Sequence, residues 1–193
     1  MLNKFFSYIF YFIYRIYTKL VFGETGKKSI IVAPIILTPK YVELGDNVYV
    51  GHNARIEGVS RYNGKIYHPV ITFCDGVSVQ QNLHLTCANR IIIGKNTAIA
   101  ANVTITDIHH PYIDINTPIE KQDIEVSEVE IGEDCKIYNG AVILSGVHIG
   151  KHVTIGANSV VTKDIPDYCV AAGIPAKIIK QYNIQTQKWE RTY

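Results

Sequence analysis

The 193-residue sequence lacks the signatures of several common protein classes. Its four cysteines (Cys74, Cys87, Cys135 and Cys169) form no CxxC pair, which argues against a zinc ribbon or a disulfide framework and favours a reducing compartment. Lys and Arg number 19 against 17 Asp and Glu, so the net charge is only +2 and a dedicated nucleic-acid binder is not expected. Charged residues make up 19% and hydrophobic residues 47%, which excludes intrinsic disorder.

The N-terminal region lacks a long apolar run. Its longest uncharged stretch, Phe5 to Tyr14, is ten residues, whereas a membrane-spanning helix needs about 20. The start is basic, but no small-residue cleavage site follows it, so a removed signal peptide is not expected.

Residues 1–24 are instead predicted to form a separate amphipathic helix. At about 100° per residue, one sector is polar and holds Asn3, Lys4, Ser7, Arg15, Thr18 and Lys19. The opposite face is apolar and holds Phe5, Phe6, Ile9, Phe12, Ile13, Ile16 and Leu20. This pattern is typical of a basic helix lying in a membrane interface. Packing of the apolar face on the rest of the protein or on a sister subunit requires the same pattern, so both alternatives remain open.

A six-residue repeat dominates the body of the chain. From Val129 it runs VEIGED, CKIYNG, AVILSG, VHIGKH, VTIGAN, SVVTKD. The third position of each hexad is bulky and apolar, here and in the hexads upstream. These positions are Leu44, Val50, Ile56, Phe73, Val79, Leu85, Ile93, Ile99, Ile105, Ile131, Ile137, Ile143, Ile149, Ile155 and Val161. A helix would repeat at three and four residues, and plain alternating strands would show no turn residue every six.

The repeat predicts an all-β solenoid of very short strands over residues 25–180. Each hexad forms one flat side followed by a turn rich in Gly, Asn and Asp, which tolerate positive φ. Three hexads close a triangular coil of about 18 residues, and the third-position side chains stack inside it. Residues 181–193 are left as a C-terminal tail.

Two stretches interrupt the repeat. Residues 57–70 contain Asn63-Gly64 between Arg61-Tyr62 and Lys65-Ile66, which is a hairpin signal. Residues 109–128 form a longer excursion with five acids and one lysine, and a loop of this length in a repeat protein is usually functional or mobile.

The start of the longer loop carries the best candidates for chemistry. Asp107, His109 and His110 lie in the stretch NVTITDIHHPY, where a regular hexad runs into the loop. Histidine is the side chain best suited to take up a proton near neutral pH. Taken alone, the pair also fits solvated histidines or histidines that satisfy a turn.

The ordered set of motifs resembles the maltose/galactoside and polysaccharide O-acetyltransferases. Hexads, NVTI…HHP, a loop, VEIG, VVTKDIP and AAGIPAK follow in that order over about residues 30–180. The resemblance implies a left-handed parallel β-helix, although the general rule favours right-handed crossovers. It implies His110 as the catalytic base, with His109 as the competing candidate. Asp107 is assigned the orientation of the imidazole, by analogy with a catalytic triad.

The resemblance also implies binding sites for acetyl-CoA and for a sugar acceptor, with no metal. The residues matching the coenzyme contacts are Asn139, Gly146, Ala157, Thr162, Lys163, Lys177 and Lys180. Acceptor-side polar groups are expected at Gln80, Asn82 and His84. Lys136 and Tyr138 depart from the family's VWIG hexad, and Gln80 and Ala88 depart from the positions that bind small free glycosides.

The sequence thus predicts an enzyme that transfers acetyl from acetyl-CoA to a hydroxyl of a surface polysaccharide or its precursor. A homotrimer is expected from the resemblance, located in the cytoplasm and without nucleic acid. Peripheral association with the inner membrane face through residues 1–22 is an open alternative. N-acetylation of a nucleotide-linked amino sugar remains an alternative. Less favoured are a zinc carbonic anhydrase using His84, His109 and His110, and a non-catalytic scaffold.

Overall fold

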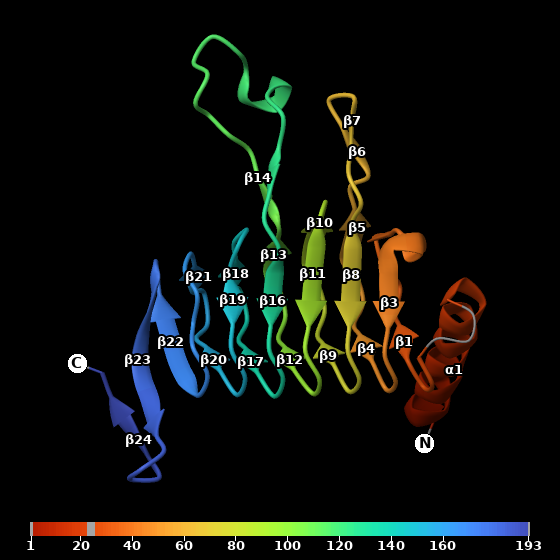
Figure 1. The fold of residues 1–193 in the computed structure, drawn as a ribbon. Coiled ribbons are helices and arrows are strands. Elements are labelled where there is room, and N and C mark those ends of the chain that lie inside the picture. Colours follow the sequence, from red (N-terminus) through yellow and green to blue (C-terminus); the bar gives the residue numbers. More distant parts are fainter. Residues whose placement is uncertain (1, 23–25, 193) are drawn as a thin grey trace.

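The computed structural model describes residues 2–22 and 26–192, without the side chains of residues 2–8. The expected boundary between residues 24 and 25 therefore lies outside the described residues. The chain forms the predicted left-handed parallel β-helix of hexapeptide repeats, with one N-terminal helix and two projecting segments (Figure 1).

Three sheets form the sides of the coil, and their strands pair in parallel apart from the last two strands of sheet A, which pair antiparallel. Sheet A contains β1 (Ile30–Ile31), β4 (Tyr49–Val50), β9 (Ser78–Val79), β12 (Ala98–Ile99), β17 (Lys136–Ile137), β20 (Thr154–Ile155), β22 (Cys169–Gly173), β23 (Ala176–Asn183) and β24 (Lys188–Arg191). Sheet B contains β2 (Ile36–Leu37), β5 (Arg55–Gly58), β10 (His84–Cys87), β13 (Thr104–Thr106), β18 (Val142–Ile143) and β21 (Val160–Val161). Sheet C contains β3 (Val42–Leu44), β8 (Val70–Phe73), β11 (Arg90–Ile93), β16 (Val129–Ile131) and β19 (His148–Ile149). A short 3-10 helix, η1 (Pro39–Tyr41), precedes β3.

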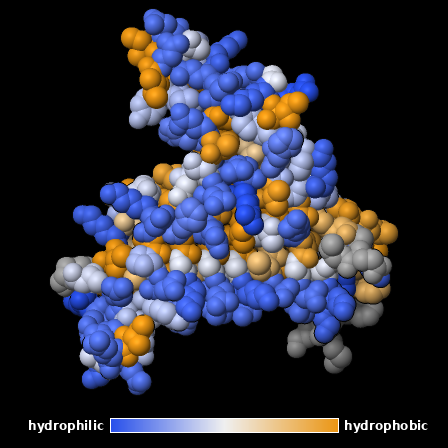
Figure 2. Space-filling view, in the orientation of Figure 1, coloured by the Kyte–Doolittle hydropathy of each residue, from blue (hydrophilic) through white to orange (hydrophobic). Residues whose placement is uncertain are grey.

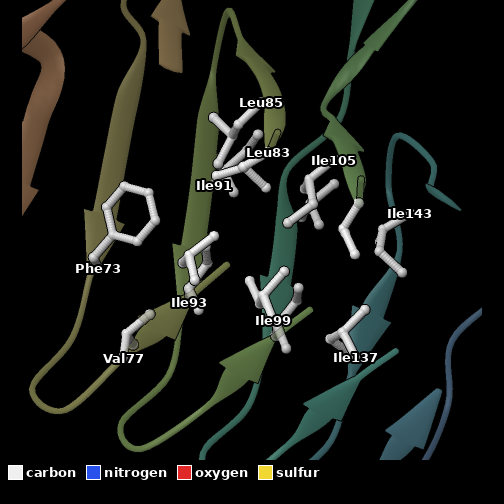
Figure 3. Close-up of a cluster of buried hydrophobic side chains, with 14 of the residues drawn as sticks. Phe73, Val77, Leu83, Leu85, Ile91, Ile93, Ile99, Ile105, Ile137 and Ile143 are labelled. Atoms are coloured by element: carbon white, nitrogen blue, oxygen red, sulfur yellow. The ribbon is translucent and has the colours of Figure 1, made fainter. Parts of the chain in front are cut away.

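The core is the stack of third-position side chains. All fifteen predicted positions are buried, with exposed fractions between 0% and 6%. Each pairs with the equivalent position of an adjacent coil, as in Ile137 with Ile155 and Ile143 with Val161. The labelled side chains in Figure 3 point toward one another inside the coil. Within the predicted range of 25–180, the coil includes a strand upstream of the fifteen positions, because Ile31 pairs with Val50.

The turns use the residue types that the hexads predicted. Asn96, Asn102 and Asn158 have φ of 56°, 61° and 55°. This left-handed conformation is accessible to asparagine and glycine at low steric cost, which explains their recurrence at the corners.

The two predicted excursions project from the same side of the solenoid (Figure 1). The first contains the hairpin of β6 (Arg61–Tyr62) and β7 (Lys65–Ile66), with Asn63 and Gly64 at its tip. The second contains β14 (Ile108–His109), η2 (Ile119–Lys121) and β15 (Glu125–Val126). Tyr67 of the first excursion and Ile124 of the second are buried in one cluster, so the two excursions share a small apolar core of their own.

Helix α1 (Leu2–Phe22) packs on the N-terminal end of the coil through Thr18 and Phe22. Thr18 is buried, and its hydroxyl donates to Tyr14 O (2.8 Å) and accepts from the Ile31 N–H (3.0 Å). The predicted apolar face points away, with Ile13 55% and Leu20 80% exposed. Figure 2 shows hydrophobic residues gathered at the end of the molecule where Figure 1 places α1. The described side chains of this face are therefore largely exposed on the single chain.

The C-terminal residues extend sheet A. Strand β23 crosses the boundary that the sequence placed at residue 180, and β24 pairs with it in antiparallel fashion. Trp189 on β24 packs edge-on against Tyr182 at 5.6 Å between ring centroids. Tyr182 and Trp189, which stand on either side of the turn at 184–187, are a sequence signal that could have indicated this hairpin.

Candidate active site

A cavity of about 490 Å³ lies where sheet B meets the two excursions. Its floor comes from β5, β10 and β13, and its walls come from the hairpin and the long loop. The lining residues are Arg55, Glu57, Val59, Tyr62, His84, Thr86, Thr104, Thr106, Ile108, His110, Glu120 and Ile124. Such a mixture of apolar surface and a few convergent polar groups is typical of a small-molecule site.

His110 lies in this cavity, and His109 does not. His109 is exposed on β14 opposite Glu125, and because neighbouring strand residues point to opposite sides, the following histidine turns inward. The His110 ring packs edge-on against Tyr62 at 5.5 Å. Its Nδ1 is buried without a hydrogen-bond partner in the described chain. Of the two candidate histidines, His110 is therefore the one whose side chain lines the cavity.

Asp107 is fully buried and binds backbone rather than a histidine. Its Oδ1 accepts from the Ala88 N–H (2.8 Å), and its Oδ2 accepts from the N–H groups of Asn89 (2.7 Å) and Arg90 (2.8 Å). The Cys87 thiol also donates to Oδ2 at 3.2 Å. No hydrogen bond joins Asp107 to a histidine in the described chain, so its carboxylate is placed to hold the corner at residues 87–90.

The surroundings of Asp107 also bear on Cys87. Burial, together with the nearby carboxylate, raises the pKa of the Cys87 thiol far above its usual value. A thiol held protonated is a poor nucleophile. The environment of Cys87 therefore suits a structural role and not a nucleophilic one.

A set of hydrogen bonds joins the hairpin to the long loop. The Tyr62 hydroxyl lies 2.9 Å from both the carbonyl oxygen and Oε2 of Glu120. The Asn63 side chain donates to the carbonyl oxygens of Glu120 (3.2 Å) and Gln122 (3.1 Å). These contacts fix the wall of the cavity that faces His110. The sequence predicted both excursions but not their contact, because no local pattern reports pairing across almost sixty residues.

The other polar groups of the cavity are largely satisfied within the chain. Arg55 forms an ion pair with Glu57, and its Nε donates to Oε2 at 2.7 Å. Burial and the adjacent Arg55 lower the pKa of His84, which favours a neutral imidazole at pH 7. Thr86 donates to Thr106 at 2.9 Å.

Only one of the three predicted acceptor-side residues reaches the cavity. His84 lines it, whereas Gln80 and Asn82 lie outside it in a turn between sheets A and B. The Asn82 side chain donates to Asn102 Oδ1 in the next coil at 2.8 Å, which is a contact within the column of turns.

The predicted donor-side residues flank the C-terminal part of sheet B. Asn139 and Ala157 occupy stacked turns at one edge of β18 and β21, since the Asn158 N–H donates to Asn139 O at 2.9 Å. Gly146, Thr162 and Lys163 lie at the other edge, where the Gly146 N–H donates to Ser127 O at the base of the loop (3.1 Å). This second column of turns therefore starts beside the loop that carries His110.

Lys177 and Lys180 lie apart from these columns, on β23. Both are exposed, as is Lys163, and within residues 26–192 none of the three forms an ion pair. They are free to meet an anionic ligand. Tyr138, one of the residues that departs from the family pattern, is 45% exposed beside Asn139.

No cluster of three or more His, Cys, Asp or Glu side chains in the described part of the chain is arranged to hold a metal ion. His84 and His110 line the cavity, but His109 lies outside it. The three histidines of the zinc alternative therefore do not converge.

Comparison with known proteins places the chain in one family. Residues 128–163 match the family described as "Bacterial transferase hexapeptide (six repeats)". The chain is 36% identical over 157 residues to WbbJ of Escherichia coli K12, described as a lipopolysaccharide biosynthesis O-acetyl transferase, covering 78% of this chain and 76% of that one.

Solved structures agree in fold. A galactoside acetyltransferase in complex with coenzyme A superimposes with a TM-score of 0.58 at 27% identity, covering 79% of this chain and 71% of that one. AntD, an N-acyltransferase from Bacillus cereus, gives a TM-score of 0.72 at 17% identity over 89% and 90% of the two chains, a likeness of fold alone. From the repeat, the loop and these relatives together, the chain belongs to the hexapeptide-repeat acetyltransferase family.

Proposed function

We propose that the protein transfers an acetyl group from acetyl-CoA to a hydroxyl of a sugar in a surface polysaccharide or its precursor. The observation that carries the proposal is the cavity in which His110 faces a lining of threonines and apolar side chains at the base of the loop. The similarity to WbbJ and to a galactoside acetyltransferase that binds coenzyme A supports both the donor and the acceptor class.

His110 would act as general base. It removes the proton of the acceptor hydroxyl, whose oxygen attacks the thioester carbonyl carbon; the C–S bond then breaks, and the imidazolium returns the proton to the departing thiolate. A backbone N–H would stabilise the oxyanion that develops. Juxtaposition of the two substrates supplies much of the remaining rate enhancement. No acyl-enzyme forms, so no cysteine is needed as a nucleophile.

The direct test of this reaction is transfer from radiolabelled acetyl-CoA to glycolipid precursors and free glycosides, with the bond type read from the product. The proposal expects an alkali-labile ester on a sugar hydroxyl. Acetylation only at the amine of a nucleotide-linked amino sugar would contradict it. Release of free acetate with no labelled sugar product would also count against it.

The donor would lie along the face of β18 and β21, with its phosphates at the unpaired lysines. Reversing one charge, Lys163→Glu, is expected to weaken acetyl-CoA binding by about tenfold or more, because a charge-assisted hydrogen bond is lost and a repulsion is gained. Calorimetry measures the change. Lys40→Glu, in η1 at the other end of the solenoid, serves as the control. Equal affinities of both variants would remove Lys163 from the site.

A homotrimer is proposed as the working assembly, with each active site completed by a neighbouring chain. The buried, unpartnered Nδ1 of His110 supports this arrangement. Burial without a partner is costly for a polar atom, and a group of a second chain or of the acceptor can supply the missing hydrogen bond. Sedimentation equilibrium is expected to give three chains per particle, and a monomer with full activity would refute the arrangement.

The outward face of α1 would hold the enzyme on the cytoplasmic membrane surface. Thr18 and Phe22 are used for packing on the coil, while Ile13, Leu20 and their apolar neighbours remain exposed. Arg15 and Lys19 are exposed on the same helix, which contains no acidic residue, and they complement anionic headgroups. No helix in the described chain is long and apolar enough to cross a bilayer.

Vesicle sedimentation tests this placement. The protein is expected to pellet with phosphatidylglycerol-containing vesicles, less so at high salt and less with pure phosphatidylcholine. The double variant Ile13→Glu/Leu20→Glu should stay in solution, whereas Ile184→Glu, an exposed apolar site on the C-terminal hairpin, should still pellet. If the double variant instead dissociates the oligomer, the face is a subunit contact and the membrane placement is wrong.

A further inference from the structure

Glu120 places a carboxylate in the wall of the cavity. It belongs to η2 in the long loop, and the Tyr62 hydroxyl contacts its Oε2 and its carbonyl oxygen, both at 2.9 Å. Its second carboxylate oxygen accepts no hydrogen bond within the described chain. The loop wall thus offers one acceptor oxygen, held in place by a residue of another segment.

The charges of the cavity do not neutralise this carboxylate. Arg55 is engaged by Glu57, with which it forms an ion pair. Burial and Arg55 lower the pKa of His84, so its imidazole adds no second positive charge to the cavity at neutral pH. Glu120 forms no ion pair with any described residue. The lining therefore has an excess of negative charge when His110 is neutral.

The remaining lining fits an uncharged polyol. Thr86, Thr104 and Thr106 present hydroxyls on the floor, while Val59, Ile108 and Ile124 present apolar surface. A pyranose ring has both kinds of surface, with hydroxyls at its rim and C–H bonds on its faces. A carboxylate can only accept hydrogen bonds, so it selects for donors and against a second anion.

We infer that Glu120 determines acceptor specificity, binding hydroxyls of a neutral sugar ring and rejecting a sugar that carries a carboxylate at this position. The inference rests on the proposed function, whose acceptor site it specifies. Tyr62 is a positioning residue here: its hydroxyl orients the Glu120 carboxylate while its ring packs against His110.

A matched pair of acceptors tests the inference. p-Nitrophenyl β-D-glucoside and p-nitrophenyl β-D-glucuronide differ only at C6, where one has a hydroxymethyl group and the other a carboxylate. Their affinities for the full chain are measured by competition in saturation-transfer NMR, and their turnover by release of coenzyme A thiol. The wild type is expected to prefer the glucoside by about tenfold, the effect of one like charge at short range near a protein surface.

The variants separate specificity from structure. Glu120→Gln keeps the size of the side chain and should bring the ratio of the two affinities close to one. Glu125→Gln, exposed in the same loop but outside the cavity, should leave the ratio unchanged. Tyr62→Phe should raise KM for the glucoside with little change in kcat, since it frees the carboxylate without removing the ring beside His110.

Three results would overturn the inference. These are equal affinities of the wild type for the two glycosides, a ratio that Glu120→Gln leaves unchanged, and binding of neither glycoside. Each of them leaves the proposed function intact as long as acetyl-CoA still binds the protein and another acceptor is acetylated. A wild-type protein that does not bind acetyl-CoA would instead refute the proposed function.

Discussion

Replacing His110 by alanine is expected to lower kcat for acetyl transfer by about 10²–10⁴-fold, the usual contribution of a positioned general base. The imidazole is the titratable group at the loop base that faces the cavity, and its ring is held by Tyr62. The alanine variant should bind acetyl-CoA with unchanged affinity, because the proposed donor site lies along the coils that follow the loop. Coenzyme A thiol release and calorimetry measure the two quantities.

The neighbouring histidine provides the matched control. His109 is exposed on β14, with its ring 6.1 Å from that of Tyr112, and it does not line the cavity. His109→Ala should therefore retain nearly all of the activity. If His109→Ala loses the activity and His110→Ala retains it, the assignment of the base is wrong, and the loop must rearrange on binding its substrates.

The second large effect is expected on stability, from Asp107→Asn. An amide can replace only one of the two carboxylate oxygens, and its NH2 group would face backbone N–H donors that it cannot satisfy. Since the group is fully buried, the free energy of unfolding should fall by about 3–5 kcal/mol. Urea denaturation followed by circular dichroism measures it. Asp123→Asn, exposed in the loop, should change it little.

The same variant distinguishes the two roles considered for Asp107. If the carboxylate holds the corner at residues 87–90, the folded fraction of the variant should keep most of its kcat at low temperature. If it orients the imidazole through an arrangement not seen in the single chain, kcat should collapse while stability is retained. The second outcome would restore the triad-like role that the sequence suggested.

The repeat made most of the fold predictable. A bulky residue at the third position of each hexad, such as Phe73 or Ile105, can be buried only inside a triangular coil. All of these side chains are buried there. The Asn63-Gly64 hairpin was equally local, because the turn type depends on two adjacent residues that accept positive φ. Local periodicity and turn chemistry therefore predicted the coil and both points of departure.

The rest depended on contacts between distant segments. The Tyr62–Glu120 contact joins two excursions that have no shared sequence pattern. Asp107 was interpreted through its neighbour His110, yet its carboxylate turns to a corner about twenty residues earlier in the chain. The amphipathic pattern of α1 did not reveal which face meets the coil. That face is fixed by a contact between separate segments, in which the Thr18 hydroxyl accepts a hydrogen bond from the Ile31 N–H.

Calorimetric titration of the purified protein with acetyl-CoA tests the acetyltransferase function most directly. Saturable binding is expected, with about one site per chain and a dissociation constant in the micromolar range. Absence of heat at millimolar acetyl-CoA would contradict it, and the cavity beside His110 would then require another explanation than acetyl transfer.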